Sequence, residues 1–191
     1  MKKKITIAGL ILGVFILVIY ITQIKYSING KATEVECSSW DATYGSVVAS
    51  AEAADNKNLP SDTIAYSYDN SLPSENPNDY MSIYVYCDVK SSSIQKYNLK
   101  MSLSSAEKYK ENILFISEQP TGADTDRFGK DNMYIILDVY IGNLSDDQIK
   151  ELVRGLNVKI KGYGEFVGKS ETNISFDKCD KIAIKRKSAV E

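Results

Sequence analysis

Strict alternation between apolar and polar side chains in two stretches limits the fold more than any other feature of this sequence. In residues 81–90, MSIYVYCDVK, the apolar positions are Met81, Ile83, Val85, Cys87 and Val89. In residues 132–142, NMYIILDVYIG, the positions Met133, Ile135, Leu137, Val139 and Ile141 face one way, whereas Tyr134, Ile136, Asp138 and Tyr140 face the other. A period of two residues is typical of a strand that buries one face. The two stretches therefore predict two half-buried strands.

Shorter segments predict further strands, at residues 63–68, 96–103, 113–117, 157–161, 172–176 and 181–185. Turn-forming residues separate them, and no long helical pattern alternates with the strands as a parallel α/β sheet requires. We therefore expect a mainly β protein, an antiparallel β-sandwich of immunoglobulin-like architecture. "Immunoglobulin-like" names only the architecture, because Trp40 follows Cys37 too closely for the spacing of true immunoglobulin domains.

One short helix is predicted at residues 144–155, LSDDQIKELVRG. Ser145 occupies the N-cap position and Gln148 follows three residues later, which is the pattern of a capping box. Gly155 is a natural helix end. Residues 46–56, SVVASAEAADN, leave helix and strand both open, because the alanines favour a helix and the alternation allows a strand.

The N-terminal region predicts a membrane anchor. Residues 5–24 carry no charge, and a helix of that length spans roughly 30 Å, the thickness of a bilayer's hydrocarbon core. Lysines at positions 2–4 favour an N-terminus inside the cell and the remaining chain outside. The apolar stretch is longer than a signal peptide's, so we expect it to be retained, although Gly30-Lys31-Ala32 leaves cleavage open.

The predicted organisation follows from that anchor. It comprises a cytoplasmic tip at 1–4, a transmembrane helix at 5–24, a linker at 25–33, an external β-sandwich at 34–187 and a tail at 188–191. This plan resembles that of many small surface proteins of Gram-positive bacteria. The resemblance covers the plan alone, since no motif indicates a particular family.

Gly9 and Gly13 stand four residues apart within the apolar stretch. Small residues at this spacing let two membrane helices approach closely. An alternative interpretation of the chain is therefore a small accessory subunit that packs into a membrane complex through this glycine face.

Composition excludes several kinds of chemistry. The chain has no histidine, which removes the Ser-His-Asp and Cys-His nucleophile systems and histidine metal ligands. Residues 32–89 contain ten acids and only one base, Lys57, so nothing favours nucleic-acid binding. We expect no catalytic role and no cofactor or metal. A surface hydrolase that relies on carboxylates alone is the less favoured alternative.

The glycine-rich stretch at residues 162–170, GYGEFVGKS, ends like a phosphate-binding loop. Such a loop requires its first glycine five residues before Gly168, where this chain has Tyr163. The flanking segments also read as strands rather than as a strand and a helix. We therefore expect part of a β-hairpin or a strand-to-strand connection here, and no nucleotide.

Residues 124–129, DTDRFG, hint at a calcium loop. The EF-hand pattern fails because its fifth position is Phe128. An irregular calcium site that uses Asp124, Asp126 or Asp131 stays open, beside the simpler interpretation of a polar hairpin loop.

Three cysteines are present, Cys37, Cys87 and Cys179. An external location permits a disulfide, and a bridge between Cys37 and Cys179 would tie the two ends of the domain together. Cys87 falls on the apolar side of its strand, which favours a buried, inert thiol.

Tyrosines on the polar faces of the two alternating strands are the best candidates for a binding surface: Tyr84, Tyr86, Tyr134 and Tyr140. The chain holds 13 Tyr against 5 Phe. Tyrosine is enriched at protein interfaces, although it also stabilises sheets through cross-strand pairs. The sequence therefore favours a non-catalytic binding or structural role, with a protein as the possible partner.

Overall fold

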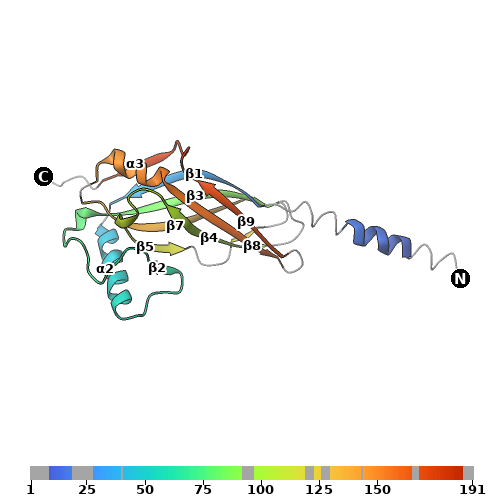
Figure 1. Ribbon diagram of the computed structural model, residues 1–191, viewed down its shortest axis with the longest axis horizontal. Coiled ribbons are helices and arrows are strands. Elements are labelled where there is room, and N and C mark those ends of the chain that lie inside the picture. The colour runs from blue at the N-terminus through green and yellow to red at the C-terminus, as the bar shows by residue number, and fades with distance from the viewer. Residues whose placement is uncertain are drawn as a thin grey trace.

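The computed structural model describes residues 9–18, 28–39, 41–91, 97–118, 123–125, 130–142, 144–164 and 168–186. Its strands form two sheets, so the protein is mainly β and sandwich-like, as predicted. Figure 1 shows the sheets stacked, with a helix on either side at one end of the strands. These helices are α2 (Asp41–Asp55) and α3 (Asp146–Arg154), and the short helical turns are η1 (Pro77–Asp79) and η2 (Lys110–Asn112).

The large sheet has the strand order β10-β1-β3-β7-β5-β2. Its strands are β1 (Ile28–Ser38), β2 (Thr63–Ala65), β3 (Tyr80–Ser91), β5 (Ile113–Glu118), β7 (Lys130–Tyr140) and β10 (Ile182–Lys185). The small sheet has the order β6-β4-β8-β9. Its strands are β4 (Tyr97–Ala106), β6 (Ala123–Thr125), β8 (Leu156–Gly164) and β9 (Gly168–Ser175).

The two strongly alternating stretches form neighbouring central strands, which confirms their prediction. β3 and β7 pair antiparallel over their length, from Tyr80 opposite Tyr140 to Lys90 opposite Lys130. Their apolar residues are buried and face the small sheet. They join one core with residues of β4, β8 and β9, among them Leu99, Met101, Val158, Ile160 and Ile174.

One pair of strands departs from the predicted antiparallel arrangement. β10 lies parallel to β1 at the edge of the large sheet, with Val35 opposite Ile182 and Cys37 opposite Ile184. The alternation within β10 correctly predicts a strand. It carries no information about direction, because the same period of two serves parallel and antiparallel pairing.

β1 begins at Ile28, within the predicted linker at 25–33. A bulge between Ala32 and Glu34 breaks the alternation of this strand, and this break hides the strand in the sequence. At Gly30 the strand passes so close to β9 that an added Cβ would lie 2.9 Å from Cγ1 of Ile174. The packed domain therefore extends further toward the N-terminus than predicted.

α2 resolves the ambiguous stretch at residues 46–56 in favour of a helix. Its buried positions are Thr43, Val47 and Ala51, four residues apart, which is the spacing of one helical face. The alternation expected for a strand fails, because Ala49 is exposed. The helix lies on the outer face of the large sheet, the face away from the small sheet, where it covers Tyr80, Leu114 and Phe115.

α3 confirms the predicted short helix in detail. The Ser145 side chain accepts a bond from the Gln148 amide, and the Gln148 side chain accepts one from the Ser145 amide. Its apolar face, Ile149, Leu152 and Val153, is fully buried in the core between the sheets. Arg186 then joins the end of β10 to this helix through Asp146, with a 2.8 Å ion pair.

The glycine-rich stretch at 162–170 forms the end of a hairpin, as predicted. β8 and β9 pair antiparallel, with Gly162 opposite Ser170 and Gly164 opposite Gly168. The connecting residues 165–167 lie outside the described residues.

Within the described parts of the chain, no helix is long and apolar enough to cross a membrane. Of the predicted span at 5–24, residues 9–18 are described and helical. The rest of that span, the predicted tip at 1–4 and the tail at 188–191 lie outside the described residues.

Candidate binding surface

The part of the outer face that α2 leaves uncovered carries three tyrosines in contact, which we call the aromatic surface: Tyr84, Tyr86 and Tyr134. The rings of Tyr84 and Tyr86 stack with centroids 6.5 Å apart and an interplanar angle of 16°. The rings of Tyr86 and Tyr134 lie 5.7 Å apart, tilted by 45°. Tyr134 is 37% exposed and the other two are half-buried.

Strand geometry brings these three rings together. Tyr84 and Tyr86 are two residues apart in β3, so they project from the same face. Tyr134 lies directly opposite Tyr86 in the register of β3 and β7. The predicted grouping of these three tyrosines is thus present.

Burial raises the pKa of the Tyr84 hydroxyl, and the neighbouring Asp138 and Glu36 carboxylates raise it further. The pKa of Tyr86 is raised by burial and then by Glu36. Both phenols therefore stay protonated at neutral pH and can donate a hydrogen bond to a partner.

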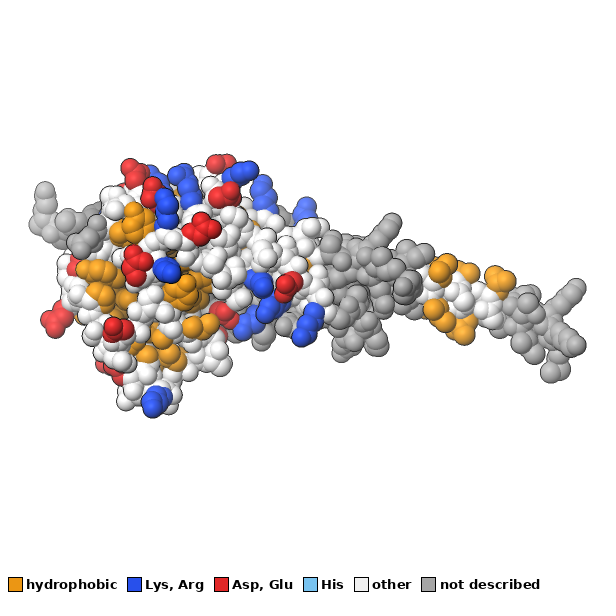
Figure 2. All heavy atoms as spheres, viewed as in Figure 1, with side chains coloured by type: hydrophobic (Ala, Val, Ile, Leu, Met, Phe, Trp, Pro, Cys, Tyr) orange, Lys and Arg blue, Asp and Glu red, His pale blue; other side chains and the backbone are white. Residues whose placement is uncertain are grey.

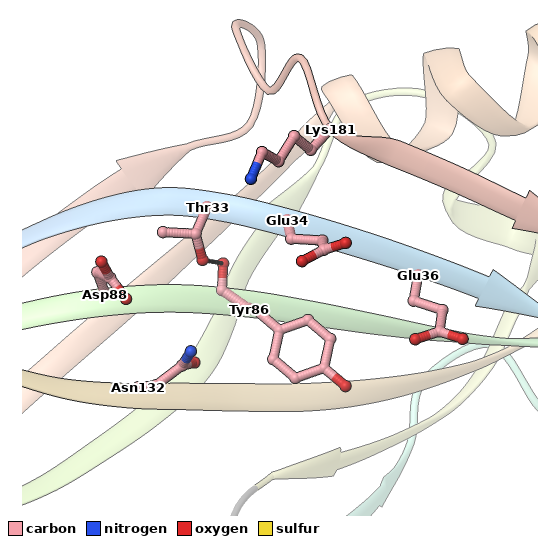
Figure 3. A pocket seen from close by; sticks show the side chains of 7 residues that line it. All are labelled: Thr33, Glu34, Glu36, Tyr86, Asp88, Asn132 and Lys181. Carbon is pink, nitrogen blue, oxygen red and sulfur yellow. Dashed lines mark hydrogen bonds between the residues drawn. The ribbon is translucent and has the colours of Figure 1, made fainter.

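A pocket of about 270 Å³ adjoins the aromatic surface, and we call it the acidic pocket (Figure 3). Its lining residues are Thr33, Glu34, Glu36, Tyr86, Asp88, Asn132 and Lys181. The β1 carboxylates lie beside the tyrosines in register, with Glu34 opposite Tyr86 and Glu36 opposite Tyr84. The pocket thus joins one aromatic wall to three carboxylates.

The β1 bulge shapes this pocket. Thr33 is the extra residue between the paired Ala32 and Glu34, and its hydroxyl donates to the Tyr86 carbonyl at 3.2 Å. Glu36 also forms an ion pair of 2.7 Å with Lys185 on the adjacent β10. The sequence showed these acids only as part of an acidic region. The signal for a shared site was the spacing of Glu34 and Glu36 two residues apart.

Tyr140, the fourth predicted tyrosine, does not join the aromatic surface. It packs against the covered end of the outer face, where its ring meets that of Tyr80 edge-on at 5.8 Å. Tyr80 in turn contacts Tyr44 of α2 at 5.4 Å. The sequence placed Tyr140 on the correct face, but it gave no sign that a helix lies over that part.

All three cysteine thiols are free and buried, so the disulfide that the sequence allows between Cys37 and Cys179 is not formed in this structure. Burial raises the pKa of Cys37 and of Cys87 to about 12. It also raises the pKa of Cys179. A thiol must ionise to act as a nucleophile, so this environment disfavours thiol chemistry.

The predicted glycine face at Gly9 and Gly13 lies within the described helix, whereas the side chains of the predicted calcium loop are not described. A Cβ added at Gly9 or Gly13 would meet nothing within 4 Å, so this face of the helix is open. The side chains of Asp124, Asp126 and Asp131 lie outside the described residues. Elsewhere in the described chain, no group of three or more Cys, Asp or Glu side chains could hold a metal ion.

Sequence reasoning missed Asp138, which the alternation of β7 assigned to the solvent side. It does lie on the outer face, but it is only 4% exposed because α2 covers it. The Ser82 hydroxyl donates to its Oδ1 at 2.9 Å. Burial raises the pKa of Asp138 to about 6, although the Ser82 bond lowers it. The sequence carried no signal for this burial, because the covering helix is not adjacent in the chain.

No protein-family model matches the chain, and no curated protein matches it in sequence. Among solved structures, it is similar to an uncharacterized β-sandwich protein from Clostridium difficile 630. The two share 11% identity, with a TM-score of 0.26, over 78% of this chain and 85% of the other. This distant likeness indicates no function.

Proposed function

We propose that this chain is a non-catalytic binding module that takes a protein partner on the outer face of its large sheet. The observation that carries the proposal is the aromatic surface, three tyrosine rings in contact on an uncovered part of the sheet. Tyrosine offers a large contact area with few rotatable bonds and a hydroxyl that can bond to a partner. Aromatic residues of this kind often dominate binding energy at interfaces.

The acidic pocket supports a partner segment that presents lysine or arginine. Glu34 lines the pocket and stands opposite Tyr86 in the register of β1 and β3. A guanidinium group can stack on a tyrosine ring and pair with a carboxylate at the same time. Charges arranged in this way fix the register of a partner and select against acidic ones.

We further propose that the module is tethered to the cell membrane by residues 5–24 and lies outside the cell. The uncharged sequence and the lysines before it support this location. In residues 9–18 the large apolar side chains are each at least half exposed, and Figure 2 shows them on opposite sides of the helix. A helix that is apolar all round suits a lipid environment or a buried position.

The chemistry of the described residues favours binding over catalysis. The carboxylate with the strongly raised pKa, Asp138, does not line the acidic pocket. An acid and base pair in one site requires carboxylates with separated pKa values that share access to a substrate. Asp138 is buried and does not line the acidic pocket, so it does not share access to a substrate with the carboxylates there.

Photo-crosslinking of the full-length chain in the cell that makes it tests the binding proposal. A photo-reactive amino acid replaces Asn132, which lines the acidic pocket. The change Tyr84→Ala with Tyr86→Ala should reduce crosslinked product at least tenfold, roughly the effect of losing one interface hot spot. Tyr66→Ala is the matched control, since Tyr66 is 40% exposed outside this surface. Equal yields from both variants would contradict the proposal.

The open glycine face supports a second candidate function, that of an accessory subunit in a membrane complex. Gly9 and Gly13 present no side chain, so a neighbouring helix could approach closely. Replacing both with leucine in the full-length chain would block that approach. Loss of crosslinks in this variant, with crosslinks retained in the tyrosine variant, would favour the accessory function over the binding surface.

A further inference from the structure

Asp138 lies at the boundary between the covered and uncovered parts of the outer face. In the register of β3 and β7 it stands opposite Ser82, between the Tyr84–Ile136 pair and the Tyr80–Tyr140 pair. The first of these pairs belongs to the uncovered sheet, and the second contributes to the apolar cluster under α2. The carboxyl is therefore located where docking of α2 begins.

Among the described residues, the hydrogen-bond partner of the buried carboxyl is a hydroxyl group. Ser82 donates to Oδ1 at 2.9 Å, and the same hydroxyl lies 3.5 Å from the Thr43 hydroxyl in the first turn of α2. In the described part of the chain, no lysine or arginine and no backbone amide of α2 bonds to Asp138. Its negative charge would thus be sealed under the helix with little compensation.

The titratable groups described around Asp138 add no positive charge. On β3 the neighbour is Tyr84, whose pKa the Asp138 charge raises. From α2 the nearest phenol is Tyr44, which packs on Tyr80, and β7 itself contributes Tyr140. β5 places Phe115 directly opposite. On β1, Glu36 is already paired with Lys185 of β10.

Among the described side chains of α2, Thr43, Val47 and Ala51 are buried, and Tyr44 and Ala54 pack partly buried against the same cluster. Apart from Tyr44, these side chains are of small to medium size. An element with so little buried apolar surface opens at a lower free energy than the strands of the core. Docking of α2 is therefore sensitive to a single unfavourable charge at its base.

We propose that α2 is a proton-sensitive cover, which stays docked when Asp138 is neutral and loosens when Asp138 is ionised. This inference goes beyond the binding function, because it concerns the helix whether or not a partner is present. Opening would uncover Tyr80, Phe115 and Tyr140, which continue the aromatic surface along the same face.

The direction of the pH effect follows from linkage. The pKa of Asp138 is about 6 with α2 docked, against the ordinary 3.8 when the carboxyl is open to water. Docking is then strongest below the lower value and weakens as pH rises through the higher one. The equilibrium constant for opening should rise roughly tenfold per pH unit between pH 4 and 6 and level off above pH 6.

Hydrogen exchange of the full-length chain, followed by mass spectrometry from pH 4.5 to 7.5 and corrected for intrinsic rates, tests the cover. Peptides from α2 should show the rise in opening, at a free energy of opening below that of peptides from β8 at every pH. In Asp138→Asn the rise should disappear, because the amide cannot ionise. In Ser82→Ala the rise should level off at a higher pH, because the removed bond lowers the pKa of Asp138 in the docked state.

Glu52→Gln, a charge change at an exposed position of the same helix, is the control and should behave as the unchanged protein. Exchange of α2 that does not vary with pH would overturn the proposal. An unchanged pH dependence in Asp138→Asn would also overturn it. Equal free energies of opening in α2 and β8 would do the same, since they would show opening of the whole domain rather than of α2.

Discussion

At Gly30 the backbone of β1 passes against Ile174 of β9, where no side chain fits without displacing a core residue. An added Cβ would lie 2.9 Å from Cγ1 of Ile174. We predict that Gly30→Ala destabilises the protein by about 1–3 kcal/mol, the usual effect of overpacking a core. Chemical denaturation would measure this change, and Ile174→Val in the same chain should recover part of it.

Gly45 provides the matched control on α2. A Cβ added there would meet nothing within 4 Å, and its position is exposed. Gly45→Ala should therefore stabilise the protein by up to about 1 kcal/mol through helix propensity. Equal effects of the two alanines on the denaturation midpoint would show that the contact with Ile174 is unimportant.

Asp138 should also affect the pH dependence of overall stability. Because its pKa is raised from 3.8 to about 6, its contribution is fully present below pH 4 and is lost as pH rises through 6. The loss amounts to about 3 kcal/mol for a shift of roughly two units. Urea unfolding of Asp138→Asn at pH 4 and pH 7 should show little of this decline. A decline as steep as in the unchanged protein would assign it to other groups.

Among the elements, α3 depends on its N-terminal cap. The Ser145 side chain accepts from the Gln148 amide at 3.3 Å, and the reciprocal bond measures 2.9 Å. Ser145→Ala should lower the free energy of unfolding by about 1 kcal/mol, whereas Ser145→Asp, another good cap, should cost little. Denaturation curves of both variants provide the comparison. Equal losses of stability from both variants would mean that the Ser145 contribution does not come from capping the helix.

The elements that the sequence revealed are those whose pattern is purely local. The alternation of β3 and β7 and the capping box of α3 are complete within a dozen residues each. β1 was partly assigned to a linker because its bulge interrupts the alternation. The sequence leaves α2 ambiguous because the buried positions in its described part, Thr43, Val47 and Ala51, include no large apolar side chain.

The sequence predicts which side chains of one strand share a face of the sheet. It does not predict which distant elements cover that face or lie beside it. The sequence grouped four tyrosines, and three of them form the aromatic surface. Tyr140 and Asp138 were misjudged because α2, from a distant part of the chain, covers them. The acidic pocket was not predicted, since it needs β1 beside β3 and a bulge at Thr33.

For the whole molecule, the buried thiols should report unfolding. Cys37, Cys87 and Cys179 are free and buried, with raised pKa values. We expect a thiol reagent at neutral pH to label all three only after denaturation, because thiolate formation and access are both suppressed in the folded state. Ser46→Cys, at an exposed position of α2, should label at once. Fewer than three reactive thiols in the unfolded chain would indicate a disulfide.

The parallel pair of β1 and β10 joins the first and the last strands that the structure describes in the domain. Contacts between such distant segments are slow to form, because a long loop must close before they are made. During synthesis, one edge of β1 therefore stays unpaired until almost the entire domain has been made. In that interval β10 of a second copy can form the same hydrogen bonds with β1. Chains at high concentration are therefore prone to domain swapping through β10.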